Sequence, residues 1–225
     1  MTTSTASVDP SPLATEPLSA TLRAATRTEH QVAETRPFIA ALMRGQLTTA
    51  AYADLAAQHL AVYAALEAAG PAVRRLPGGA DIVIDHLERV PAIEADLAHL
   101  LGPTWRGQVR VLPATERYAT HLRTVAPASV AAFAAHAYVR YLGDLSGGQA
   151  IRAILQRSYG LPDEAVGFYT FAAVPKPKLF KDEYRARLDA LPLDAAGRAV
   201  AVTEAKLAFE LTTDLFTELG AAHLP

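Results

Sequence analysis

The 225-residue sequence contains no cysteine. This absence excludes disulfide bonds, thiolate metal sites, iron–sulfur clusters and cysteine nucleophiles. It is also the pattern expected of a protein that works in a reducing compartment. We therefore predict a cytoplasmic protein whose chemistry depends on other side chains.

The sequence also lacks a large excess of charge of one sign. It has 21 Lys and Arg against 23 Asp and Glu, a formal net charge of −2. A protein that binds nucleic acid usually carries a strong positive field. We therefore expect no nucleic-acid partner.

Long apolar runs are absent as well. The longest nearly unbroken one, "VAAFAAHAYV", is far shorter than the roughly 18 residues that a membrane span needs, so we expect no membrane anchor. The first 17 residues have neither the basic start nor the apolar stretch of a signal peptide. Their Ser, Thr and Pro content predicts a disordered lead-in over 1–17.

What the sequence does contain is helix-forming residues, chiefly Ala, Leu, Glu and Arg, with no convincing alternation of period two. Gly- and Pro-containing segments divide the chain. No repeat and no long linker appears, so the prediction is one all-α domain over 18–221. We expect helices over 19–34, 37–44, 49–69, 80–100, 114–123, 127–158, 177–190 and 194–219.

A histidine on the first predicted helix is the first candidate functional residue. Arg23, Thr26, His30 and Glu34 fall on one helical face because residues three and four apart are neighbours. A neutral imidazole is a common axial ligand of haem iron, and Glu34 is placed to hold its second nitrogen. A surface His–Glu pair explains the same spacing, so this pattern alone leaves both readings open.

The segment "GDLSGGQ", residues 143–149, puts three poor helix formers inside a predicted helix. Gly143 and Gly147 lie one turn apart and Gly148 is adjacent, so one helical face has almost no side chains. A flat ligand or a second backbone can approach such a face closely, and the glycines also permit a kink. Asp144 argues against simple packing, because a carboxylate is costly in an apolar seam.

Several segments together resemble the haem oxygenase family. They are "TRTEHQVAE" on the first helix, "HAYVR" followed by "YLGDLSGGQ", and then "GFYTF", "FKDEYRARL" and "EAKLAFELTTDLF". The resemblance extends from Leu18 to Leu219. It implies a single-domain helical bundle with haem sandwiched between a proximal helix and a kinked distal helix.

The resemblance also implies roles for individual residues. His30 matches the axial iron ligand and Glu34 its neighbouring acid, while Asp144 matches the aspartate that organises distal water. The expected catalytic residues are Asp144, Gly143 and Arg140. The expected haem-binding residues are Arg23, His30, Glu34, Tyr138, Gly143, Gly147, Gly148, Lys181, Arg185 and Phe209.

Some of these assignments depend on the resemblance alone. Lys181 and Arg185 form an i,i+4 pair suited to the haem propionates, although a basic helix face is commonly just solvated. Phe209 matches a wall residue, but a core phenylalanine has the same sequence signature. Val139 and Thr212 stand where some relatives carry polar residues, which leaves the details of the distal water network open.

The resemblance implies a monooxygenase that cleaves haem to biliverdin, CO and ferrous iron with O2. No Gly-x-Gly-x-x-Gly motif for flavin or nicotinamide occurs, so electrons are expected from an external donor such as a ferredoxin or a flavoprotein reductase. The alternative is a haem-binding or storage protein without turnover, which needs His30 but not Asp144. A di-iron carboxylate bundle needs Glu-x-x-His pairs, and the sequence has none. We expect the remaining histidines to be structural or exposed, with His136 the second choice of iron ligand: His59, His86, His99, His121, His136 and His223.

Overall fold

The computed structural model describes residues 16–225, and within that range every regular element is a helix. This confirms the all-α prediction. The expected lead-in over 1–17 lies almost entirely outside the described residues. The α-helices are α1 (Leu18–Ala25), α2 (Arg27–Glu34), α3 (Pro37–Met43), α4 (Thr49–Ala68), α5 (Gly70–Val73), α6 (Gly79–Ile82), α7 (Val90–Leu101), α8 (Pro113–Val125), α9 (Val130–Asp144), α10 (Gly148–Tyr159), α11 (Pro177–Asp189) and α12 (Ala195–His223).

Two predicted helices are divided in the structure. The expected helix over 19–34 breaks at Thr26, whose hydroxyl donates a hydrogen bond to the Leu22 carbonyl at 2.8 Å; such back-bonding bends helices. The expected helix over 127–158 becomes α9 and α10, which are separated by Leu145–Gly147. The clustered glycines therefore do interrupt the helix where the kink was expected.

The prediction of one helix over 80–100 is wrong. The chain forms α6, then extended backbone at Val83 and Ile84, a short 3-10 turn, and finally α7 from Val90. Two β-branched residues in sequence favour the extended backbone, and Pro91 in the first turn of α7 is tolerated only at a helix start. The last helix also extends past 219, its predicted end, to His223.

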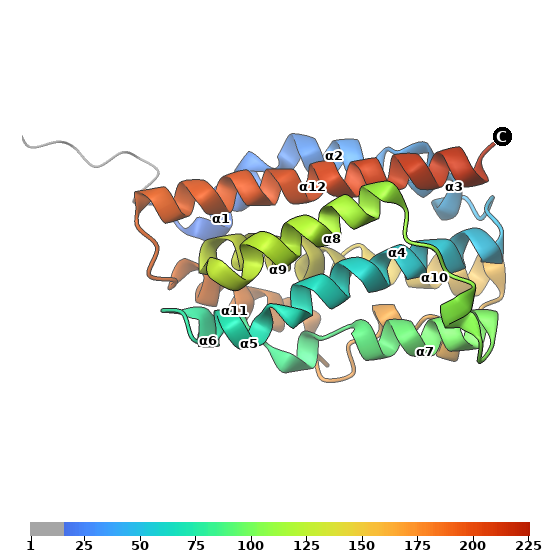
Figure 1. Ribbon diagram of the computed structural model, residues 1–225, viewed down its shortest axis with the longest axis horizontal. Helices are drawn as coiled ribbons and strands as arrows, with labels where there is room; N and C mark the ends of the chain where they lie inside the picture. The colour runs from blue at the N-terminus through green and yellow to red at the C-terminus, as the bar shows by residue number, and fades with distance from the viewer. Residues whose placement is uncertain (1–15) are drawn as a thin grey trace, which may run out of the picture.

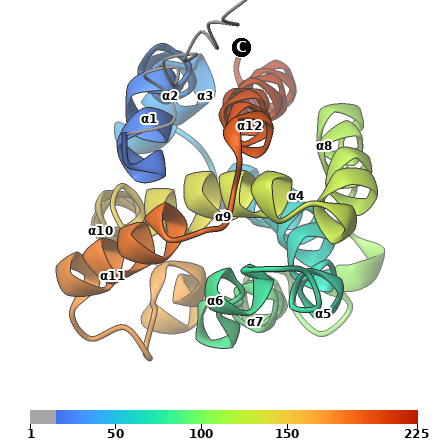
Figure 2. The same cartoon turned by 90° about the vertical axis from the view of Figure 1, so that its left-hand side faces the viewer.

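The helices surround α9, which runs through the middle of the molecule. In Figure 2, α1, α2, α3 and α12 lie on one side of α9, α10 and α11 flank it, and α6 and α7 lie on the other side. Figure 1 shows that α12 runs nearly the whole length of the molecule beside α1–α3. The glycine segment joins the end of α9 to the start of α10. This arrangement therefore places the segment beside the α1–α2 layer.

Alanine allows the central helices to pack closely on several sides. Most of α4 and α9 is buried, and Ala134, Ala135 and Ala137 of α9 have no exposed surface. Side-chain oxygens of Thr48 and Ser129 accept hydrogen bonds from the backbone at the starts of α4 and α9, which are ordinary N-caps. The glycine segment is thus attached to a rigid central helix.

None of the helices in the described part of the chain combines the length and the apolar character needed to cross a membrane. The longest helix, α12, alternates buried positions such as Ala201, Ala205 and Ala208 with polar ones. Its apolar stripe packs on α9 and on α1–α3, as an amphipathic helix of a bundle does.

Candidate functional site

A cavity of about 670 Å³ opens where the α1–α2 layer, the α9–α10 break and α12 meet. Its volume is that of a cofactor-sized pocket. Every predicted site residue except Lys181 lines it: Arg23, His30, Glu34, Tyr138, Arg140, Gly143, Asp144, Gly147, Gly148, Arg185 and Phe209. The fold therefore gathers residues from six helices that are up to 186 positions apart in the sequence, counting from 23 to 209.

His30 lies on the α2 side of the cavity. Its Nδ1 is 3.4 Å from Glu34 Oε2, and its ring meets Phe209 edge-on with the centroids 5.4 Å apart. The His30 and Glu34 side chains are 52% and 64% exposed. Because Glu34 holds Nδ1, Nε2 is the nitrogen available to a metal in the cavity. This is the arrangement expected of an axial ligand with its orienting acid.

Gly143 and Gly147 form the bare surface opposite. A Cβ added at Gly143 would meet no atom within 4 Å, and one at Gly147 would meet only the Gly143 carbonyl oxygen, at 3.7 Å. The polypeptide itself therefore does not need glycine at these two positions for packing. What the glycines leave open is the cavity, which suits a flat ligand lying against backbone.

Gly148 is a glycine for a different reason. A Cβ there would lie 2.8 Å from Cδ1 of Tyr169, closer than real contacts allow. Tyr169 belongs to the "GFYTF" segment, whose backbone N–H groups at Gly167 and Phe168 donate to the Asp96 carboxylate at 2.8 Å each. The segment thus packs behind the start of α10 and fixes its position.

Asp144 is held at the cavity wall by a partner from α4. The Tyr63 hydroxyl donates a short hydrogen bond to Asp144 Oδ2. Burial raises the pKa of Asp144, and the Arg140 charge, the Tyr63 hydrogen bond and the Arg89 charge oppose that rise only in part. A carboxyl group with a raised pKa can hold or release a proton more readily near neutral pH than an ordinary aspartate.

Arg140 is buried next to this pair. Its guanidinium carbon lies 5.1 Å from the centre of the Tyr63 ring. Burial would lower its pKa, but the surrounding Tyr63, Asp144 and Tyr118 raise it overall, so the side chain stays charged. Its Nε is buried without a hydrogen-bond partner among the described residues. Such an atom usually faces an ordered water, and Arg140 lines the cavity.

Three further cationic side chains are among the residues that line the cavity. Arg23, Arg27 and Arg185 line it, and the charges of Arg185 and Arg23 act on Tyr138, whose pKa burial raises. Arg185 also pairs with Asp182 at 2.7 Å. Lys181 does not line the cavity; its Nζ donates to Ser146 Oγ at 2.9 Å, so it reaches the site only through the glycine segment.

Some residues of this site were not found from the sequence. Tyr63 carried no local signal, because its position depends on how α4 packs, whereas Arg27 could have been found from its spacing of four from Arg23 and three from His30. His136, the second choice of iron ligand, does not line the cavity; its ring bonds to Tyr118 and Glu204 on the other side of α9. Thr212 lines the cavity, but its hydroxyl donates to the Ala208 carbonyl at 2.7 Å.

Comparison with known proteins gives one consistent result. A family model described as heme oxygenase matches residues 16–218. Heme oxygenase 1 from Homo sapiens is 37% identical over 205 residues, covering 90% of this chain and 71% of that protein. Heme oxygenase 1 from Synechocystis sp. is 34% identical over 202 residues, covering 90% of this chain and 84% of that protein.

Solved structures agree with the sequence matches. The crystal structure of heme oxygenase-1 from Synechocystis, in complex with heme, superimposes with a TM-score of 0.88 at 33% identity, over 92% of this chain and 94% of that one. The heme oxygenase of Leptospira interrogans superimposes with a TM-score of 0.86 at 31% identity, over 90% of this chain and 100% of that one. The similarity thus extends over the helices that build the cavity.

Proposed function

Since the chain belongs to the haem oxygenase family, we propose that it is a monooxygenase that cleaves haem to biliverdin, carbon monoxide and ferrous iron. Haem is then both its substrate and its cofactor. When bound, haem iron supplies the site at which O2 is activated. All other steps depend on how the residues of the cavity hold the porphyrin and deliver protons.

One observation supports turnover over simple haem storage. A half-buried carboxylate, Asp144, lies directly beside the bare glycine surface, where Tyr63 holds it by a hydrogen bond and the Arg140 charge acts on it. Storage needs His30 and the cavity, but it gains nothing from a desolvated acid, which costs stability. A proton-handling group facing the oxygen side of a haem is what a monooxygenase needs.

The residues present fit haem chemically. His30 offers Nε2 to iron while Glu34 holds Nδ1. Arg23, Arg27 and Arg185 line the cavity, and their charges would pair with the propionates of a bound haem. Gly143 and Gly147 leave the cavity open beside their backbone, where a flat ring and a small ligand beside it would have room.

Asp144 holds water in this proposal. Its carboxyl group accepts from Tyr63, which leaves its second oxygen for a water that the unpartnered Nε of Arg140 also faces. The raised pKa of Asp144 lets it pass a proton to that water. Proton supply through a water, rather than by direct contact with the carboxyl group, would suit the oxygen chemistry that haem supplies when bound.

Electrons come from a separate protein in this proposal. A ferredoxin or a flavoprotein reductase fits a cavity lined by Arg23, Arg27 and Arg185, because complementary charge steers protein partners toward each other. The cytoplasmic location stays a prediction.

The decisive experiment is turnover with haem. The chain is loaded with haem and given a reductant in air, and the bilin product is followed by its absorbance and identified by chromatography. We expect the haem spectrum to decay to biliverdin with release of ferrous iron. A haem complex that stays intact under these conditions supports storage instead.

A further inference from the structure

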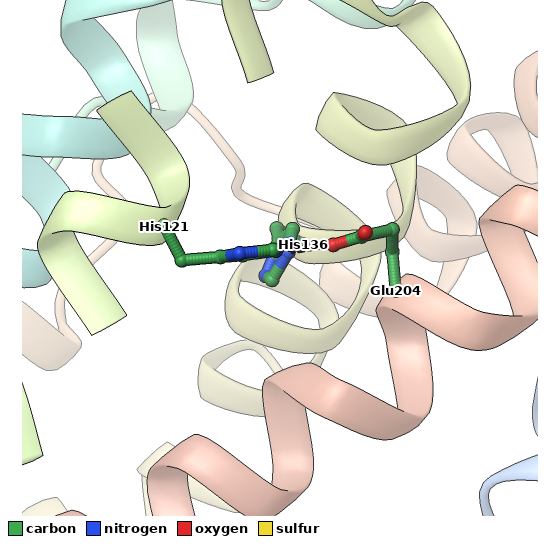
Figure 3. A group of neighbouring side chains, drawn as sticks. All are labelled: His121, His136 and Glu204. Carbon is green, nitrogen blue, oxygen red and sulfur yellow. Dashed lines mark hydrogen bonds and ion pairs between the residues drawn. The ribbon is translucent and has the colours of Figure 1, made fainter. Parts of the chain in front are cut away.

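A second group of chemically notable side chains lies on the far side of α9 from the cavity. His121 of α8, His136 of α9 and Glu204 of α12 point toward one another, as Figure 3 shows. Nε2 of His121 is 2.7 Å from Glu204 Oε2, and Nε2 of His136 is 3.0 Å from the same oxygen. None of the three lines the haem cavity, so the proposed function leaves them without a role.

We propose that His121, His136 and Glu204 form a binding site for a Zn²⁺-like divalent transition-metal ion. Two imidazole nitrogens and one carboxylate oxygen are a donor set that zinc prefers, with a water in the fourth position. The three donor atoms all lie within 4.8 Å of one another. The inference is independent of the haem reaction, because it uses no residue of the cavity.

The geometry needs only a small adjustment. Zinc–ligand distances of about 2.0–2.2 Å put tetrahedral donor atoms about 3.3–3.5 Å apart. The two nitrogen–oxygen distances, 2.7 and 3.0 Å, therefore have to lengthen by about half an ångström. Rotation of the Glu204 side chain can lengthen these two distances, and the two imidazole rings, whose donor nitrogens also lie within 4.8 Å of each other, would have to adjust to the same spacing.

The surroundings of His136 already match those of a metal-bound histidine. Its Nδ1 is 3.2 Å from the Tyr118 hydroxyl. Without a metal, Nε2 of His136 carries the ring proton and donates to Glu204, so Nδ1 accepts a hydrogen bond from the Tyr118 hydroxyl. With a metal ion at Nε2, the proton moves to Nδ1, which then donates to the Tyr118 oxygen. Ligating histidines usually have such an outer partner.

Charge and access also fit a cation. Hydrogen bonds from His136 and His121 hold the pKa of Glu204 at about 2 against the effect of burial, so the carboxylate is ionised. Burial lowers the pKa of His136 despite Glu204, so its ring is neutral. The charge of Arg140, one turn along α9, opposes a cation. The His121 and Glu204 side chains are 26% and 14% exposed, which leaves a path for the ion and its water.

The test uses the full-length, tag-free, haem-free chain with His30→Ala as the background, so that the His30–Glu34 pair cannot bind the metal. Zn²⁺ binding is measured by equilibrium dialysis, and Co²⁺ by its visible absorption bands. We expect one Zn²⁺ per chain, a Zn²⁺-dependent rise in the melting temperature, and Co²⁺ bands of a four- or five-coordinate site.

Variants identify the ligands. His121→Ala and Glu204→Gln should each weaken Zn²⁺ binding about tenfold or more, whereas His99→Ala, which removes an exposed histidine of α7, should not change it. Stability of each variant without metal is measured in parallel. Absence of Zn²⁺ binding in the background chain, or binding that both ligand variants retain, would overturn the proposal and leave the three residues as a cross-link between helices.

Discussion

The two sides of the haem cavity are built very differently. On the α2 side, His30 and Glu34 are 52% and 64% exposed and share one contact at 3.4 Å. On the α9 side, half-buried Asp144 belongs to a network with three buried residues: Tyr63 donates a hydrogen bond to it, and the charges of Arg140 and Arg89 act on it. The α9 side is thus ordered by the polypeptide before any ligand binds. The α2 side depends on its ligand to complete its interactions.

This difference matters for catalysis. Proton delivery needs groups already fixed at the right distance, since their reorganisation would add to the barrier. An axial histidine needs only one free nitrogen and a held ring. We therefore expect substitutions on the α2 side to change haem binding, and substitutions on the α9 side to change chemistry after binding.

His30→Ala should produce the largest effect. The cavity then offers no histidine to iron, because the other histidines of the described chain do not line it. We expect loss of the histidine-ligated haem spectrum, measured by absorption and by resonance Raman, with much of it restored by added imidazole. An unchanged spectrum would assign the iron ligand to another residue. The α2 side would then have no special role in binding haem.

Asp144→Ala should leave haem binding intact and impair turnover. The carboxylate is placed to act on protons, so we expect the rate of biliverdin formation to fall about 10²-fold or more. Tyr63→Phe removes one hydrogen bond to Asp144 and serves as a graded control. Its rate of biliverdin formation should lie between those of the native chain and Asp144→Ala. Normal biliverdin formation by Asp144→Ala would show that the buried network is structural.

Gly148→Ala and Gly143→Ala test which glycine is required by the packing of the polypeptide and which one keeps room in the cavity for the ligand. A Cβ at Gly148 clashes with Tyr169, whereas one at Gly143 meets nothing within 4 Å. We expect Gly148→Ala to lower the free energy of unfolding of the haem-free chain by about 1–3 kcal/mol. Gly143→Ala should keep or raise it by up to about 1 kcal/mol through helix propensity, and Gly143→Leu should obstruct haem turnover. Equal losses of stability at both positions would contradict this division, and denaturant titration measures it.

The sequence predicted the parts of this site that are local. The spacing of His30 and Glu34 and the cluster of Gly143, Gly147 and Gly148 are visible within one or two helical turns, and the structure brings them to one cavity. Nothing local could distinguish Gly148 from the other two, because its reason is Tyr169, from a later segment.

The parts that depend on tertiary packing could not be predicted in this way. Tyr63 precedes Asp144 by 81 residues, and it has the same sequence context as a core tyrosine in an alanine-rich helix. Lys181 and Arg185 share a helix face, yet only Arg185 lines the cavity. The break near 83–89 was missed because a short apolar pair such as Val83 and Ile84 is compatible with either a helix or an extended segment.

The buried side should also show a pH dependence through Glu67, which accepts the backbone N–H groups of Arg89 and Val90. Burial raises the pKa of Glu67 to about 7, against hydrogen bonds that lower it. The folded state therefore binds more protons than the unfolded state between about pH 4.5 and 7. The contribution of Glu67 to the free energy of unfolding is therefore fully present below that range and is lost as pH rises through it.

Glu67→Gln removes this titration. Relative to the variant, the native chain should lose about 1–3 kcal/mol of unfolding free energy between pH 4.5 and 7. The two proteins are compared by urea unfolding at several pH values. A difference that does not change with pH would mean that Glu67 titrates normally.

The smallest effect is expected at the exposed end of the cavity. Arg185 lines the cavity, and Lys181 donates a hydrogen bond to Ser146; both are accessible to solvent, where a charge pair is worth about 0–1 kcal/mol. Haem affinity should therefore change little in Arg185→Ala, in Lys181→Ala, or in the double variant. Orientation is more sensitive, because haem can rotate in the cavity with little change in its apolar contacts. We expect Arg185→Ala to mix the biliverdin isomers, Lys181→Ala to do so less, and chromatography of the bilins to measure both. If even the double variant yields a single, unchanged isomer, then wall residues such as Phe209 fix the ring, and the charged end of the cavity serves only the redox partner.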